Sequence, residues 1–268
     1  MSGFDLTAIG RPGPTHTYDV TEEALRRYAD ATDDVPGGPV FAIVPVWEAI
    51  APASLAVASA EVRKHVVHYE QDIIVHRPIE PGTTLTSSAT PTAVLPRPNG
   101  TSVVIRTETR DDADALVSEQ YVTEFFRGIE SAESVGGRAP AHSLDVDGDA
   151  PIAEIAYPVA DDQTARYAEA SGDHFAIHLD DEFARSVGLP GRIVHGLCTM
   201  ALAGRAVLEV AGIADPRTVG RLAVRFSAPL FPGETLTTRV WEVDGGYGFD
   251  ASGTAGRAVI KDGRLELR

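Results

Sequence analysis

Apolar residues recur at helical spacing twice in each half of this 268-residue chain. A short helix is expected first. In the N-terminal half it follows Thr21, because threonine is a favoured N-cap and Glu22 and Glu23 would occupy the first turn. In the C-terminal half the corresponding helix follows Asp161. Both halves are therefore predicted to open with the same element.

A longer apolar helix is expected next, and its pattern is clearest in the C-terminal half, over about residues 194–210. Gly212 is placed to end this helix. The N-terminal counterpart lies near residues 44–62 and is interrupted by Pro52. The apolar residues at helical spacing in the C-terminal helix are Leu197, Met200, Ala201, Gly204, Val207 and Leu208.

Strand-like segments, several of them alternating polar and apolar residues, fill the rest of each half. Asn99-Gly100 and Asp262-Gly263 are typical hairpin turns. Helices followed by an antiparallel meander predict an α+β fold in which a sheet wraps around one central helix. The segments are 67–79, 84–95, 101–111 and 115–126 in the first half, and 219–230, 234–244, 247–256 and 258–268 in the second.

The two halves also share short stretches of sequence. "RRYADATDD" parallels "ARYAEASGD", which matches Tyr28 with Tyr167, and "RPIEPGTTLT" parallels "APLFPGETLT", which matches Gly82 with Gly233. The same order of matches indicates an internal duplication. Between the halves, residues 128–151 are rich in Gly, Ala, Ser and Asp and have the composition of a linker. We therefore expect an N-terminal unit over 1–127 and a C-terminal unit over 152–268.

The composition narrows the possible partners and surroundings. A formal charge of -16 argues against binding to nucleic acid or to an anionic membrane surface. The single cysteine, Cys198, cannot form an intrachain disulfide and is expected to be a small core residue rather than a nucleophile. We expect neither a secretory signal nor a membrane-spanning segment of roughly 18 apolar residues. The protein is expected to be cytoplasmic.

The densest chemistry lies in "YAEASGDHFAIHLDDEFARSVGLPGRIVHG", residues 167–196. Asp173 and His178 could divide acid and base work, one accepting a proton from water and the other donating one to carbon. His195-Gly196 opens the long apolar helix, so the N–H of Gly196 could receive a developing negative oxygen. This combination suits chemistry beside a thioester carbonyl.

Two other interpretations of this stretch are open. Asp173 could cap a turn while His178 lies on a half-buried face. Alternatively, Asp173, His174, His178 and His195 could be metal ligands, although a helix spanning His174 and His178 is not assured after the glycine. We expect no metal and no cofactor, because the chain contains neither a dinucleotide-type glycine loop nor a cysteine cluster.

The stretch resembles the hydratase-2 motif of the MaoC-like dehydratases, the (R)-specific enoyl-CoA hydratases, and the resemblance extends over essentially the whole chain. It implies a double hot-dog fold and a hydro-lyase that converts a trans-2-enoyl thioester reversibly to an (R)-3-hydroxyacyl thioester. By resemblance, Asp173 and His178 would be the catalytic pair and Gly196 the oxyanion donor. The N-terminal half, without the motif, would accommodate the acyl tail.

One departure from the motif is clear, since Phe175-Ala176 stands where the family has Asn-Pro. Phenylalanine cannot make the hydrogen bond by which that asparagine helps to hold the attacking water. We expect His174, Phe175, His195 and Arg192 to line the substrate site. The substrate would be an acyl-CoA or an acyl carrier protein thioester, and a homodimer is expected. The alternatives are a hot-dog thioesterase and a non-catalytic or partner-dependent acyl-thioester binding protein.

Overall fold

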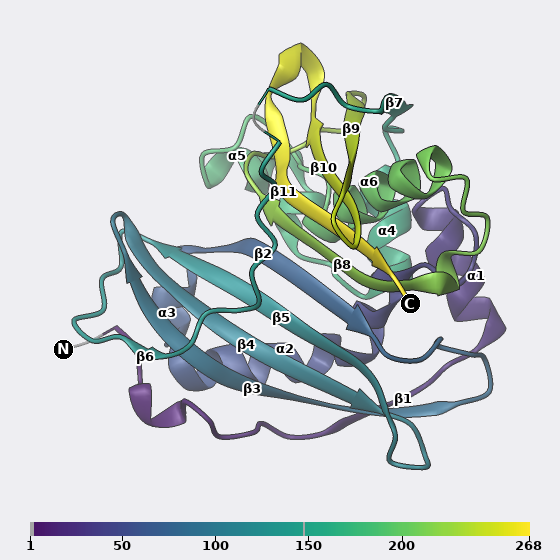
Figure 1. Ribbon diagram of the computed structural model, residues 1–268. Coiled ribbons are helices and arrows are strands. Elements are labelled where there is room, and N and C mark those ends of the chain that lie inside the picture. The colour runs from purple at the N-terminus through teal and green to yellow at the C-terminus, as the bar shows by residue number, and fades with distance from the viewer. Residues whose placement is uncertain (1–2, 147) are drawn as a thin grey trace. The chain divides into compact units, whose positions relative to one another are not determined.

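A computed structural model describes residues 3–146 and 148–268 of the chain. The chain divides into two compact units, drawn in Figure 1. The first consists of residues up to Val20 and of Pro45–Ala141, and the second of Thr21–Val44 and His142–Arg268. This division differs from the boundaries predicted at 127 and 152, because the segment from Thr21 to Val44 belongs with the second unit.

The first unit is built on an antiparallel sheet with the strand order β1-β3-β4-β5-β2, and a short sixth strand pairs with β3. Arg97 pairs with Gly100, so the hairpin predicted around Asn99-Gly100 is present, with Pro98 and Asn99 as its two turn residues. The strands are β1 (His16–Asp19), β2 (Val66–Val75), β3 (Thr84–Arg97), β4 (Gly100–Arg110), β5 (Leu116–Arg127) and β6 (Val135–Gly136).

Helix α2 (Trp47–Val57) packs against β3 and β4 of this sheet and is preceded by the 3-10 segment η2 (Pro39–Val46). Pro52 lies inside α2 without ending it. Ser54 of α2 donates a hydrogen bond of 2.5 Å to the buried carboxyl of Glu124 on β5, and burial raises the pKa of Glu124. This contact identifies the sheet face that α2 covers. The remaining helical elements of the unit are η1 (Leu6–Ala8) and α3 (Ala60–Arg63).

The prediction that no apolar segment of the chain is long enough to span a membrane is wrong. The helical run Pro39–Val57 has 19 residues and a mean hydropathy of 1.8, so its length and composition would allow it to cross a membrane. However, 61% of its most apolar window is buried inside the protein, and a core helix meets the same two criteria.

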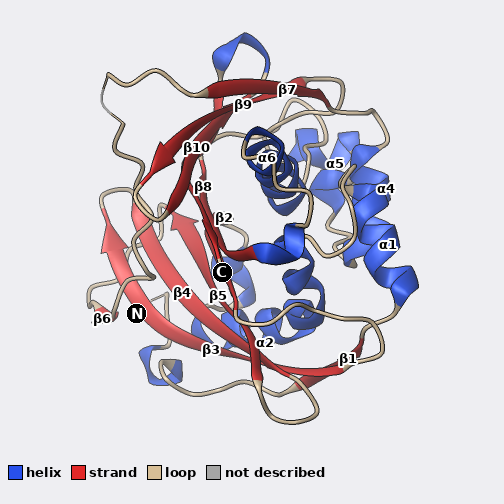
Figure 2. Cartoon of the chain, turned by 45° about the vertical axis from the view of Figure 1, so that its right-hand side comes forward, coloured by secondary structure: helices blue, strands red, loops and turns tan. Residues whose placement is uncertain are grey.

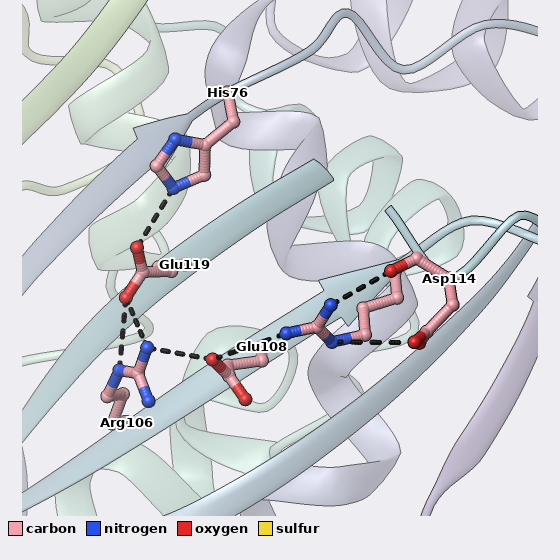
Figure 3. Close-up of polar contacts among 6 residues, drawn as sticks. His76, Arg106, Glu108, Asp114 and Glu119 are labelled. Carbon is pink, nitrogen blue, oxygen red and sulfur yellow. Dashed lines mark hydrogen bonds and ion pairs between the residues drawn. The ribbon is translucent and has the colours of Figure 1, made fainter. Parts of the chain in front are cut away.

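Side chains that alternate with the buried residues of β4 and β5 lie on the other face of the sheet and carry charge. Figure 3 shows them joined in one network. Arg106 binds Glu119 at 2.5 Å and Glu108 at 2.8 Å, and Glu119 also accepts a hydrogen bond from His76 at 2.9 Å. These side chains are partly exposed, so each pair contributes little to stability. The network extends from Glu108 through Arg110 to Asp114.

The second unit has its own antiparallel sheet, with the order β8-β11-β10-β9-β7. The hairpin predicted at Asp262-Gly263 is wrong, because both residues lie within β11. The register of β11 against β8 shifts between Lys261 and Arg264, and Asp262 has φ 52. The positive φ that a hairpin turn requires serves a β-bulge here. The strands are β7 (Ala153–Pro158), β8 (Val219–Phe226), β9 (Thr235–Val243), β10 (Gly246–Ser252) and β11 (Ala258–Leu267).

The central helix of the second unit is α6 (Gly196–Val210), which packs against this sheet and begins and ends close to its predicted limits. Cys198 lies inside it, fully buried, as expected for a core residue. Figure 2 shows α1, α4 and α5 gathered beside α6. The other helical elements are α1 (Glu22–Ala31), α4 (Gln163–Ser171), η3 (Ala176–His178), α5 (Asp181–Ser186), η4 (Pro216–Thr218) and η5 (Thr254–Gly256).

The two helices that the duplication matched, α1 and α4, pack against each other. The hydroxyls of Tyr28 and Tyr167 are 3.0 Å apart although the residues are separated by 139 positions. Arg27 donates to the Glu169 carbonyl of α4, and Arg166 donates to the Asp30 carbonyl of α1. This reciprocal exchange is what a local two-fold relation between repeated elements produces.

Candidate active site

The loop after α4 holds Asp173 in a fixed turn. Gly172 ends the helix with φ 81, a left-handed conformation that glycine adopts without steric cost. The N–H of Asp173 then bonds to Ser171 Oγ at 3.2 Å, and its Oδ1 accepts the N–H of Phe175 at 3.1 Å. The carboxylate is half-buried. One of its oxygens is thus anchored by the loop itself.

His178 ends the 3-10 turn η3 and is buried. Its Nδ1–H donates to the carbonyl of Ile193 at 2.8 Å, and the N–H of Ile193 donates to the Ile177 carbonyl at 3.1 Å. Because a carbonyl can only accept, the neutral imidazole carries its lone pair on Nε2. Burial lowers the pKa of His178, so the ring is neutral near pH 7 and available as a base.

His195 immediately precedes α6 and is 1% exposed. Its Nε2–H donates to the backbone carbonyl of Asp173 at 3.0 Å. Its ring stacks on that of His178, with centroids 3.7 Å apart and planes inclined by 22°. Burial and the neighbouring His178 lower the pKa of His195 to about 3. This imidazole therefore stays neutral over the pH range in which enzymes work.

Gly196 is the first residue of α6, so its N–H has no carbonyl to bind within the helix and lies at the positive end of the helix dipole. A side chain at this position would press on Phe226, since a Cβ would lie 3.2 Å from the ring. The glycine therefore allows Phe226 to pack against the start of α6, whose first N–H could bind an oxyanion.

The structure brings Asp173, His178 and His195 together, with one nitrogen or oxygen of each inside a span of 4.8 Å. These residue types could hold a metal ion. The ring stacking argues against it here: a metal lies in the plane of each imidazole that binds it, and two nearly parallel planes 3.7 Å apart do not meet near either ring. A shared ion at the usual distance of roughly 2 Å from both nitrogens would not fit this arrangement.

Three other predicted site residues are placed differently. The side chain of His174 is 54% exposed and lies 3.9 Å from Glu169. Phe175 is 57% exposed, and its ring meets that of Phe183 edge-on at 6.2 Å. Arg192 donates its guanidinium to the Asp161 carbonyl at 3.2 Å. Only the backbone N–H of Phe175 contributes to the cluster directly.

Tyr167 also packs against the cluster, although its sequence position indicated only a landmark of the repeat. It is buried, and its ring centroid lies 4.8 Å from that of His195. Its position one helical turn before Ser171, on the same face of α4, is the signal that could have identified it. Burial raises the pKa of the Cys198 thiol to about 12, so the nearby cysteine is not activated as a nucleophile.

Each unit is a hot-dog fold, an antiparallel sheet packed on a central helix, and the second carries a carboxylate–imidazole pair beside the N-terminus of that helix. The chain belongs to the MaoC-like dehydratases. Residues 145–262 match the MaoC like domain, and residues 20–128 match the MFE-2 hydratase 2 N-terminal domain. The chain is similar to the 3-hydroxyacyl-thioester dehydratase Y of Mycobacterium tuberculosis, with 31% identity over 75% of this chain and 72% of that protein.

Other similarities differ widely in how much of the relative they cover. The peroxisomal enoyl-CoA hydratase 2 of Arabidopsis thaliana is 44% identical over 26% of this chain and 23% of its own length. Among solved structures, a MaoC-like dehydratase from Phytophthora capsici has a TM-score of 0.87, 25% identity and 98% coverage of both chains. A Mycobacterium tuberculosis protein described as a double hotdog fold has a TM-score of 0.58 at 18% identity, over 94% of each chain. The predicted double hot-dog fold is confirmed.

Proposed function

We propose that Asp173 and His178 catalyse the reversible addition of water to a trans-2-enoyl thioester, giving an (R)-3-hydroxyacyl thioester. The chain is a hydro-lyase of the hydratase 2 type, as its family membership indicates. The observation that carries the residue assignment is the buried His178 ring, whose Nδ1–H is bound by Ile193 so that Nε2 is the basic atom of the cluster. The carboxylate of Asp173 lies within the same 4.8 Å span.

In the hydration direction the pair takes one proton from a water molecule as the water oxygen bonds to C3 of the substrate. Nε2 of neutral His178 accepts that proton, and the Asp173 carboxylate orients the water by accepting its second hydrogen. The double bond's electrons move toward the thioester oxygen. The pair then returns the proton to C2, so that H and OH add to the same face and both side chains end unchanged.

The charge that develops on the thioester oxygen needs a donor, which we assign to the N–H of Gly196. A helix N-terminus offers this N–H already oriented, and loss of one such donor typically costs roughly a hundredfold or more in rate. Phe175 cannot replace the family's asparagine in holding the water, so Asp173 and His178 must position it between them.

For the substrate, we propose only the chemical class of the thiol carrier and the place where the acyl group binds. A thioester substrate fits the family, and either coenzyme A or an acyl carrier protein could carry it. The N-terminal unit is proposed to accommodate the acyl tail. By the repeat, Asp34 matches Asp173 but Pro39 stands where His178 would be, so this copy of the motif lacks a base.

The test follows the enoyl-thioester absorbance on mixing purified protein with short, medium-chain and ring-bearing trans-2-enoyl-CoAs. We expect the absorbance to fall with wild-type protein and to stay constant with Asp173→Asn. A thiol-reactive dye in parallel samples separates hydration from hydrolysis, because only hydrolysis releases free thiol. Folded protein without turnover on any of these substrates would refute the assignment and favour an acyl-thioester binding role.

A further inference from the structure

A single side chain joins the three groups to which the chemistry is assigned. His195 is bonded through its Nε2–H to the backbone carbonyl of Asp173, and its ring is stacked on His178. Its own peptide bond leads into Gly196, the first residue of α6. Its carbonyl is also fixed, because it accepts both the N–H and the hydroxyl of Thr199.

Packing alone does not account for a histidine at this position. With Nε2–H donated to Asp173, Nδ1 of the neutral ring carries a lone pair, and this buried atom has no hydrogen-bond partner among the described residues. A buried polar atom without a partner destabilises a fold. An aromatic hydrocarbon ring would fill the same space without an unpartnered nitrogen. What distinguishes the histidine is therefore its other nitrogen, Nε2, which binds the Asp173 carbonyl.

We infer that His195 is a positioning residue, which holds the Asp173 backbone and the His178 ring in a fixed relation to the N–H of Gly196. The inference rests on the proposed function and specifies how the catalytic groups of its site are held in position. The hydrogen bond to Asp173 sets where the carboxylate loop lies against the start of α6, and the ring stacking sets the plane of the His178 imidazole. Acid–base chemistry requires such placement within about half an ångström.

The stacked ring also controls the surroundings of His178. His195 excludes water from one face of that imidazole while remaining uncharged, so His178 is desolvated and stays neutral. The titratable side chains that act on the two rings are Asp173 and His174 from the loop and Tyr167 from α4. Of these, Asp173 favours protonation of His178, in opposition to the effect of burial.

Two substitutions separate the two contacts of His195. His195→Phe keeps a ring that can stack on His178 and removes the N–H that binds the Asp173 carbonyl. His195→Gln keeps an amide N–H that can reach that carbonyl and removes the ring. His142→Phe is a matched control, because Nδ1–H of His142 also donates to a backbone carbonyl, that of Asp262, at 2.7 Å outside the site.

For His195→Phe we expect kcat to fall about 10- to 100-fold, with KM and the acid limb of the pH profile little changed. For His195→Gln we expect the acid limb to move to higher pH, because His178 regains water and its pKa rises toward the ordinary value of 6.5. His142→Phe should stay within about twofold of wild type. Circular dichroism on every variant confirms that the protein is folded.

Kinetics and NMR titration of His178 together distinguish failure of this inference from failure of the proposed function. Wild-type turnover, with both His195 variants within twofold and an unshifted acid limb, would overturn the positioning role and leave the function intact. If wild-type protein shows no turnover, the titration decides. A His178 pKa that rises in His195→Gln but not in His195→Phe supports the arrangement, and equal pKa values in all three proteins refute it.

Discussion

The loops after α1 and α4 begin alike and diverge within a few residues. Each contains an aspartate whose Oδ1 accepts a nearby backbone N–H, from Val35 to Asp34 at 2.8 Å and from Phe175 to Asp173 at 3.1 Å. After α4 the chain supplies His178 five residues later. After α1 the same position is Pro39, and the loop borders a cavity of about 20 Å³ that is lined by apolar side chains and by Thr32, Asp34 and Arg205.

The difference between the two loops separates what the repeated fold supplies to the site from what only the second copy supplies. Repeated helices carry an aspartate to the start of each loop. Burial raises the pKa of Asp34, and the backbone N–H of Val35 and the charge of Arg205 oppose that shift. What the first copy lacks is a base held by a carbonyl, as Ile193 holds His178. By the proposed mechanism, a carboxylate in this turn is therefore not sufficient for acid–base chemistry.

The sharpest test of this comparison is removal of the imidazole. For His178→Gln we expect the hydration rate to fall by about 10²–10⁴, because general acid–base catalysis contributes that range. The measurement is the initial loss of enoyl-thioester absorbance in protein shown by circular dichroism to be folded. A rate within tenfold of wild type would mean that Asp173 performs the proton transfer without His178.

The second test uses acid stability, because only the loop after α4 is packed against buried imidazoles. His195 has a pKa lowered to about 3 when folded and an ordinary value of 6.5. Below pH 6.5 the unfolded chain binds a proton that the folded protein does not, so stability is lost as pH falls. This preferential protonation of the unfolded chain lowers the free energy of unfolding by about 2 kcal/mol at pH 5.

Urea unfolding at pH 7.5 and pH 5 measures that loss, and His195→Phe should lose about 2 kcal/mol less than wild type over the same interval. Burial also lowers the pKa of His178, and that of His68 to about 4, so part of the acid sensitivity should remain in the variant. Equal losses in the two proteins would show that His195 is protonated in the folded state.

A smaller effect is expected from restoring the family residue in the motif. Phe175→Asn replaces an exposed ring with an amide. The substitution keeps the backbone N–H through which residue 175 binds Asp173. We expect kcat to rise up to about tenfold, because one added hydrogen bond would hold the attacking water. Progress curves at saturating substrate measure it. A fall in kcat/KM with kcat unchanged would instead show that the Phe175 ring binds the substrate.

The smallest effect is expected in the first copy. Asp34→Asn should change turnover by less than about twofold, because the repeat has Pro39 after Asp34 where His178 follows Asp173. It should leave stability equal or slightly higher at pH 7, since a carboxyl with a raised pKa opposes folding when it is ionised. Kinetics and urea unfolding provide both values. A loss of activity like that of Asp173→Asn would show that both copies of the motif take part.

Much of the fold could be predicted because its largest elements carry strong periodic signals. The apolar pattern located α6 nearly to the residue, and the matched tyrosines indicated the duplication before their contact was known. The edge strands β1 and β7 were missed, since they have 4 and 6 residues and alternate between half-buried and exposed positions. Asp262-Gly263 misled because a positive φ suits a bulge as well as a turn.

The sequence predicted the residues that cluster in the candidate site, but not how their side chains are oriented. Spacing brought out Asp173, His178 and Gly196, yet it treated His174 and His195 as similar neighbours. The 3-10 turn after Phe175 leaves His174 exposed, whereas the start of α6 places His195 in the interior. Ring stacking and the carbonyl partners of the two imidazoles depend on tertiary packing, which no local pattern encodes.

The exchange of contacts between α1 and α4 has a consequence for the order of events during synthesis. Tyr28 leaves the ribosome long before Tyr167, its partner 139 residues later, has been added. Until then the side of α1 that packs on α4 has no partner, while the first compact unit is completed from residues up to Val20 and from Pro45–Ala141. The nascent chain must keep this helix from aggregating through its apolar face. The acidic first turn and the charged outer face of α1 oppose such association before the active site has formed.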